Sequence, residues 1–300
     1  MKRLILSALI FLLSGAAFAQ TRSELYDRFT ESRAQQDTAA VAAVITDWER
    51  LYPGDAELYS LRANYHFMNA FEAVAVMTDE EPGPGKRALE FVDSLGVTRY
   101  MYSKLVPKED KVNAAKSILA EGITKNPDRL DLRVGKAYLH LQMAEHALVA
   151  QEMISALERS ALNGDKWIGI LDAPIESDSE AGLEVNVQTF FYELANTEDL
   201  APAGSLVDTA IRLYPRNPIY LADKAALSYF SGDLEEALKY YSSAFEIAPD
   251  DMLIASNIAH IYEELGDKQN AVKYYRIVAA SDDQEFAGEA NDKIRKLTAE

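Results

Sequence analysis

The chain has no cysteine among its 300 residues. Without a thiol it can form neither disulfides nor thiolate metal sites, and it has no cysteine nucleophile. Lipid attachment through an N-terminal cysteine is excluded too, so this is not a lipoprotein of the usual bacterial kind. Its stability must come from packing, and 48% hydrophobic residues are enough for a sizeable core.

The motifs of common catalytic and cofactor sites are also missing. No HExxH, GxSxG or Rossmann fingerprint occurs, and the GxGK at 83–86 has neither the spacing of a phosphate loop nor a following Ser or Thr. The histidines are isolated from one another by spacing: His66, His140, His146 and His260. We therefore expect no catalytic residues, no metal and no cofactor, and interpret the protein as non-enzymatic.

Positive charge is scarce. Thirty Lys and Arg residues stand against 48 Asp and Glu residues, for a formal net charge of −18. Such a surface repels nucleic acid and anionic lipid headgroups. This balance favours a protein or peptide partner and argues against nucleic acid.

Only one hydrophobic run is long, and it lies at the N-terminus. Lys2 and Arg3 precede the apolar residues 4–13, and Ala17-Phe18-Ala19 forms a small-x-small cleavage box. This order predicts a secretory signal peptide over 1–19, with Gln20 as the mature start. An uncleaved anchor or a buried helix are the alternatives, but the run is shorter than the roughly 20 residues of a membrane span. We expect a periplasmic or secreted mature chain with no integral span.

A sequence repeat near the C-terminus, which we call the echo, shows how the chain is organised. Five residues recur 34 positions later: Gly232, Asp233, Ala237, Tyr240 and Tyr241 return as Gly266, Asp267, Ala271, Tyr274 and Tyr275. A period of about 34 residues is that of the tetratricopeptide helical hairpin.

Three successive frames resemble tetratricopeptide repeats in the positions of their small, large and turn residues: 184–217, 218–251 and 252–281. The resemblance implies an all-α fold, an α-α superhelical solenoid of helical hairpins. Residues 282–300 place Ala287, Ala290, Ile294 and Leu297 at helical spacing after an acidic start, which predicts a C-terminal capping helix.

The N-terminal region, 20–161, is predicted to be helical and repeat-like but irregular. Weaker frames begin at 22 and 128; in the latter, Tyr138 and Ala147 fit two packing positions. Between the frames, the apolar residues from Leu58 onward predict a helix running to about Met77, followed by a break at 79–85.

The period is interrupted by 22 extra residues, 162–183, which include Trp167. Two interpretations are open. The insert fills a seam between two parts of the solenoid and buries Trp167, or it is a functional loop, since loops of this length often are.

Family members bind partners on a concave face lined by the first helix of each hairpin. The resemblance assigns seven residues of this chain to that face: Gln188, Tyr192, Asn196, Tyr229, Phe230, Asn257 and His260. The Lys and Asn pair with which some members hold a peptide carboxylate is absent, since the matching pairs are Gln188/Tyr192, Ala222/Ala226 and Ser256/His260.

The sequence thus predicts an exported, non-enzymatic scaffold that binds a protein or an extended peptide. An alternative is an envelope assembly or transport factor, acting in outer-membrane biogenesis or polymer export. A third is a glycan-acting enzyme that uses the 162–183 insert and Trp167.

Overall fold

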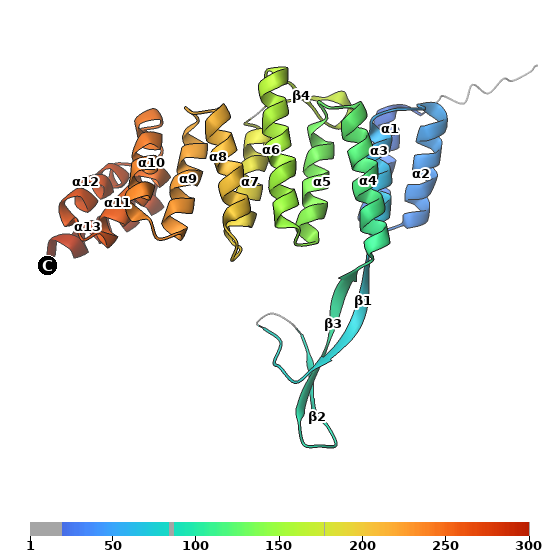
Figure 1. Cartoon of the computed structure of the whole chain (residues 1–300), viewed down its shortest axis with the longest axis horizontal. Coiled ribbons are helices and arrows are strands. Elements are labelled where there is room, and N and C mark those ends of the chain that lie inside the picture. The colour runs from blue at the N-terminus through green and yellow to red at the C-terminus, as the bar shows by residue number, and fades with distance from the viewer. Residues whose placement is uncertain (1–19, 84–86, 177, 300) are drawn as a thin grey trace, which may run out of the picture.

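The computed structural model describes residues 20–83, 87–176 and 178–299. The expected leader over 1–19 and residues 84–86 of the GxGK lie outside the described residues. Helices dominate and form an elongated row of antiparallel pairs, which confirms the predicted helical solenoid (Figure 1). They are α1 (Arg22–Ala34), α2 (Thr38–Leu51), α3 (Glu57–Met68), α4 (Glu109–Lys125), α5 (Leu130–Gln142), α6 (His146–Asn163), α7 (Leu183–Ala195), α8 (Ala201–Leu213), α9 (Pro218–Phe230), α10 (Leu234–Ile247), α11 (Met252–Glu264), α12 (Lys268–Ala279) and α13 (Gln284–Ala299).

The Gly-Asp echo forms the turns of two hairpins. Gly232 (φ 80°) and Gly266 (φ 75°) are left-handed, a conformation that glycine adopts without steric cost. The next residue caps the second helix: the Asp233 carboxylate accepts from the Glu236 N–H at 2.9 Å, and Asp267 caps α12 in the same way. Each repeat therefore carries its own turn and helix start.

Small residues lie where the paired helices meet. Ala225 of α9 and Ala237 of α10 are fully buried, as are Ala259 and Ala271 in the next pair. Buried tyrosines fill the space beside them, Tyr241 among them. This packing leaves little internal space in the C-terminal half.

Both packing positions assigned in the frame at 128–161 are wrong: Tyr138 is 45% exposed, whereas His140, two residues later, is buried. Ala147, assigned to a packing position, is exposed, whereas Val149 is fully buried. The buried residue lies four positions after the helix N-cap, as Ala237 does after Asp233, but here the N-cap is Glu145. The turn between α5 and α6 has three residues, as does the turn between α9 and α10, so the frame itself begins two residues later than predicted, at 130.

The helix expected to run to about Met77 is also wrong. α3 ends at Met68, and the chain continues as an antiparallel sheet of β1 (Phe71–Thr78), β2 (Leu89–Val92) and β3 (Thr98–Pro107), in the order β1-β3-β2. β1 and β3 pair without a bulge from Phe71↔Pro107 to Thr78↔Tyr100. The sheet projects from the α3–α4 junction away from the helices (Figure 1); we call it the arm.

The residues of the arm explain the error. Branched and aromatic residues alternate along both long strands, with Val74 and Val76 on one and Tyr100 and Tyr102 on the other. That period of two suits a pleated strand. If only their apolar content is considered, the same residues predict that the preceding helix continues.

The 162–183 insert is an ordered connection between α6 and α7. It contains the short strands β4 (Trp167–Ile168) and β5 (Pro174–Ile175), joined by the 3-10 turn η1 (Ile170–Asp172). Trp167 is 2% exposed; its Nε1–H donates to Ser160 Oγ at 2.9 Å, and the Arg133 guanidinium lies 5.7 Å from its ring. The tryptophan fixes the insert to the solenoid.

A buried ion network attaches the insert to the first helices. Glu57 of α3 and Arg129 are both fully buried and form an ion pair at 2.9 Å. Glu57 also accepts from the Leu171 N–H at 2.6 Å, and Asp172 pairs with Arg22 at 2.8 Å. Burial raises the pKa of the Glu57 carboxyl, and the hydrogen bond from Arg129 opposes that shift. Leu171 and Asp172 have positive φ, a strained conformation that these contacts hold.

At the other end of the row, α13 closes the solenoid. The Asp283 carboxylate accepts from the Glu285 N–H at 2.9 Å, and Ala287 and Ala290 are buried. None of the helices in the described residues combines the length and apolar character that a membrane span requires.

Candidate functional site

Two adjoining cavities lie on either side of one face of α5. Their volumes are about 810 and 750 Å³, and both are lined by Asp131, Gly135 and Tyr138. Tyr138 is 45% exposed, so its ring is available to a ligand. We call the two cavities together the N-terminal cleft.

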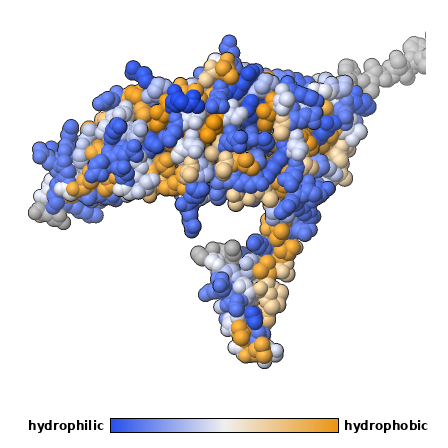
Figure 2. Space-filling view, viewed as in Figure 1, coloured by the Kyte–Doolittle hydropathy of each residue, from blue (hydrophilic) through white to orange (hydrophobic). Residues whose placement is uncertain are grey.

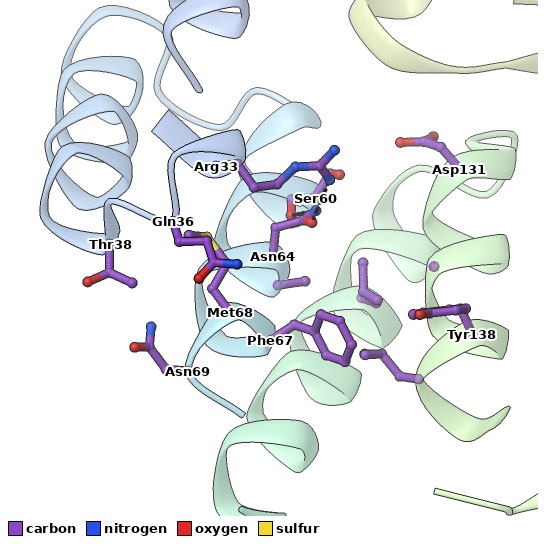
Figure 3. A pocket seen from close by; sticks show the side chains of 14 residues that line it. Arg33, Gln36, Thr38, Ser60, Asn64, Phe67, Met68, Asn69, Asp131 and Tyr138 are labelled. Atoms are coloured by element: carbon purple, nitrogen blue, oxygen red, sulfur yellow. Dashed lines mark hydrogen bonds between the residues drawn. The ribbon is translucent and has the colours of Figure 1, made fainter. Parts of the chain in front are cut away.

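The first cavity is mixed in character. Figure 3 shows Arg33, Asn64 and Asn69 around it, with Phe67 and Tyr138 approaching from two sides. The two rings meet edge to face with centroids 5.9 Å apart. The Arg33 guanidinium donates to Asn64 Oδ1 at 3.2 Å. Amides, a guanidinium and aromatic edges can together bind an extended backbone and its side chains.

The second cavity is mostly apolar. α5, the insert and α7 line it with Val134, Leu141, Ile170, Ile175 and Phe190. The insert lies between α5 and α7 and supplies one wall of the space. Glu193 and Asp131 add negative charge at its margin. A bulky apolar side chain fits such a space.

None of the seven residues predicted for the partner face lies in the N-terminal cleft. They lie on α7, α9 and α11 or at a helix end, and form a separate C-terminal surface. Tyr192 and Phe230 are exposed at 43% and 49%, and Gln188 is half-buried. Asn196 is the exposed C-cap of α7.

The remaining three residues interact across α9 and α11. The Tyr229 hydroxyl donates to Glu264 at 2.7 Å and lies 3.2 Å from His260 Nε2. The Asn257 amide donates to the Tyr241 hydroxyl at 3.2 Å. Asn257 and His260 also line a third cavity of about 570 Å³, beside Lys293 of α13. The structure thus groups these residues, but does not show what they bind.

Asp223 is the most perturbed acid at the C-terminal surface. It lies at an inward position of α9 but is only 1% exposed, and its Oδ1 has no hydrogen-bond partner among the described residues. Burial raises the pKa of Asp223 to about 7, although a hydrogen bond from Gln188 lowers it. Such a carboxyl is mostly protonated in mildly acidic surroundings.

Sequence reasoning missed the N-terminal cleft. Tyr138 matched a packing position of the repeat, and Phe67 and Asn64 fell in a stretch without a clear frame. The signal available was indirect: the cleft lies beside the two interruptions of the period, the arm after α3 and the insert before α7. Where the repeat is interrupted, neighbouring helices do not fill the space between them.

The arrangement offers binding surfaces. Within the described ranges, no group of three or more His, Asp or Glu residues could hold a metal ion. Trp167 is buried, so its ring cannot stack on a sugar, and the glycan-acting interpretation loses the residue on which it depended.

The architecture and the repeat turns define a solenoid of helical hairpins. Residues 220–251 and 254–278 match the tetratricopeptide repeat family model, so the chain carries tetratricopeptide repeats. Repeats of this kind generally serve as non-enzymatic scaffolds for protein interactions. The match covers the two most regular hairpins and leaves the N-terminal half outside it.

A curated relative is the TPR repeat-containing thioredoxin TTL4 of Arabidopsis thaliana, 36% identical over 84 residues. That stretch is 28% of this chain but only 12% of the relative. Among solved structures, a tetratricopeptide repeat protein from Parabacteroides merdae is 11% identical, with 93% of this chain and 87% of that one covered and a TM-score of 0.42. PilW, described as a type IV pilus biogenesis factor, is 13% identical, with 93% and 99% covered and a TM-score of 0.41. Similarity at this level carries no partner or activity over to this chain.

Proposed function

We propose that the protein is an exported scaffold that binds an extended polypeptide in the N-terminal cleft. The observation that carries this proposal is the pair of adjoining cavities with the exposed Tyr138 ring between them. A continuous cleft of this size suits several residues of an extended chain rather than a single small ligand.

The two cavities call for different chemistry in the bound segment. The amides around the first cavity suit backbone groups, which they can meet as donors and acceptors. The apolar second cavity suits a Leu, Ile or Phe side chain about two residues along the same segment. The net charge of −18 favours a neutral or basic partner. The C-terminal surface, with Tyr192, Tyr229 and His260, is the predicted continuation of the same contact.

Photocrosslinking in the native host tests the site. A benzoylphenylalanine at position 138 is expected to capture one partner that Tyr138→Ala no longer retains in a pull-down. The matched control places the same probe at Leu162, which is 80% exposed and lines neither cavity of the cleft. Equal capture at both positions would show that the cleft is not the binding site. A probe at Tyr192 then tells whether the C-terminal surface contacts the same partner.

Export is a separate part of the proposal and rests on the sequence of residues 1–19. N-terminal sequencing of the protein from the host is expected to begin at Gln20, and fractionation to place it in the periplasm or medium. A chain that begins at Met1 and stays in the cytosol would contradict export without affecting the cleft.

A role as an envelope assembly or transport factor is the second candidate. The arm favours it, because it places a second surface away from the helices and so lets one molecule contact two components. Partner capture decides between the two, since a transport or surface-assembly component is expected only for the second.

A further inference from the structure

The arm has one apolar face that no other part of the described chain covers. Antiparallel partners lie on the same face of a sheet, so the register places Met77 with Met101 and Leu89, and Ala73 with Leu105. Six residues of this face are exposed: Ala73, Ala75, Met77, Leu89, Met101 and Leu105. We call them the apolar face of the arm. Hydrophobic residues run along the arm in Figure 2.

The opposite face of the arm differs. Val74, Val76, Tyr100 and Tyr102 are half-buried and cover one another, and charged residues such as Lys104 lie among them. That face leaves one large apolar side chain open, Val92, which is 65% exposed. The apolar face instead exposes Leu105 by 66%, Met77 by 61% and Leu89 by 59%.

A small sheet with an open apolar face needs a partner that packs against that face. Two- or three-stranded sheets gain independent stability only when a hydrophobic face is packed. Burying a Leu or Met side chain contributes roughly 1.5–3 kcal/mol. No helix packs against the apolar face (Figure 1), so the cover must come from outside the described chain.

Charge separates the arm from the rest of the molecule. Residues 71–107 carry six acidic and four basic side chains, a net charge of −2 within the chain's −18. Two copies of the helical row repel each other strongly, whereas two arms repel each other only weakly. A strand of eight residues at about 3.3 Å each spans roughly 26 Å, several times the Debye length of about 8 Å, so arm contact keeps the helices apart.

The shape of the face also suits a copy of itself. Ala73, Ala75 and Ser103 are small and central, which lets two sheets approach, and larger side chains at both ends can interdigitate. A two-fold axis brings each face onto its own equivalent, as in most homodimers.

We propose that two copies of this chain associate through their arms, apolar face against apolar face. The contact is small. Two strands about 26 Å long and a third about half that length, about 4.8 Å apart, make a face of roughly 300 Å² in each copy, well below the roughly 800 Å² per partner of a standard interface. The dimer is therefore reversible and concentration-dependent. It is independent of the proposed function, because none of the six residues of the apolar face lines the N-terminal cleft.

Sedimentation velocity of the purified mature chain over a concentration series tests the dimer. A shift from monomer to dimer is expected, and Leu105→Glu is expected to raise the dimer Kd at least tenfold. The matched control is Val92→Glu, which adds the same charge to a side chain 65% exposed on the opposite face. It should dimerise like the wild type. Far-ultraviolet circular dichroism should show that both variants fold.

A cysteine probe gives a second readout that does not depend on weakening the contact. Because the chain has no cysteine of its own, Ser103→Cys introduces a single thiol at the centre of the apolar face. A short bismaleimide is expected to join two copies of Ser103→Cys and far fewer of Val92→Cys.

Three results would overturn the proposal. One is a monomer at every concentration with no crosslink at Ser103→Cys. Another is equal loss of dimer in Leu105→Glu and Val92→Glu. The third is a monomer that floats with phosphatidylcholine vesicles unless Leu105→Glu is present, since this would identify a lipid surface as the cover.

Discussion

The two halves of the solenoid use the same helical hairpin but connect it differently. From α7 to α13 the turns are short, Gly-Asp pairs form those after α9 and α11, and buried alanines and tyrosines lie between the paired helices. From α1 to α6 the turn after α3 is replaced by the arm, and α6 is followed by the insert. The two larger cavities lie in and beside this interrupted half. In this molecule the interruptions of the repeat create the cavities and the arm.

The largest expected effect is on the interrupted half. Arg129→Met removes one partner of a fully buried ion pair and leaves Glu57 with only the more distant Arg22 guanidinium, 3.8 Å away. We expect a loss of about 3–5 kcal/mol in the free energy of unfolding, measured in urea. Lys125→Met, which breaks an exposed pair with Glu121, is the control and should cost less than about 1 kcal/mol. Equal effects of the two variants would show that the buried network does not hold the insert.

A pH titration tests the regular half. The folded pKa of Asp223 is raised to about 7 from its ordinary value of 3.8, so the folded chain holds a proton that the unfolded chain releases. This stabilisation is complete below pH 3.8 and is lost as the pH rises to about 7, by about 1.4 kcal/mol per unit. Asp223→Asn should remove that slope. The measurement is urea unfolding of both proteins from pH 4 to 8, and parallel curves would contradict the assignment.

A larger side chain is enough to disturb the close contact of paired helices. Ala237→Leu overpacks a fully buried position and should lower the free energy of unfolding by roughly 1–3 kcal/mol. Ala147→Leu makes the same change at an exposed alanine and should leave stability within about 0.5 kcal/mol. A large loss of stability in Ala147→Leu would instead support the register predicted from the sequence, in which Ala147 occupies a packing position.

The smallest effect concerns the insert. Trp167→Phe keeps an aromatic ring but removes the hydrogen bond to Ser160, which should cost about 1 kcal/mol. Hydrogen exchange should then rise in 164–182 and not in α9 to α12. Uniform exchange throughout the chain would mean that Trp167 does not act locally.

The sequence identified the repeat hairpins correctly because their signals are local. Gly232 and Asp233 set a turn and a cap through their own backbone and carboxylate, and Ala237 follows at a fixed distance. The same reasoning failed at 71–107, where an apolar stretch was taken for a helix although its alternation had a period of two. It failed again at Ala147, because the α5–α6 turn has Ala144 and Glu145 in place of glycine and aspartate, and without that local signal the frame was set two residues too early.

The candidate site was less predictable than the fold. The family resemblance located partner-facing residues only where the repeat is regular, so it selected Tyr192, Tyr229 and His260. The cavities instead lie where the repeat is broken. Their walls come from segments far apart in the sequence, such as Phe67 and Ile175, and no local pattern relates such segments.

By itself the sequence determined the helical hairpins of the C-terminal half, the absence of thiol chemistry and the strong negative charge, because composition and short-range spacing fix each of these. Only the tertiary structure decided that Glu57 and Arg129 join the insert to the first helices, that Trp167 is buried, and that a sheet with an open apolar face projects from the row. These features depend on contacts between residues many positions apart, and such contacts are set by how the helices stack rather than by any period in the chain.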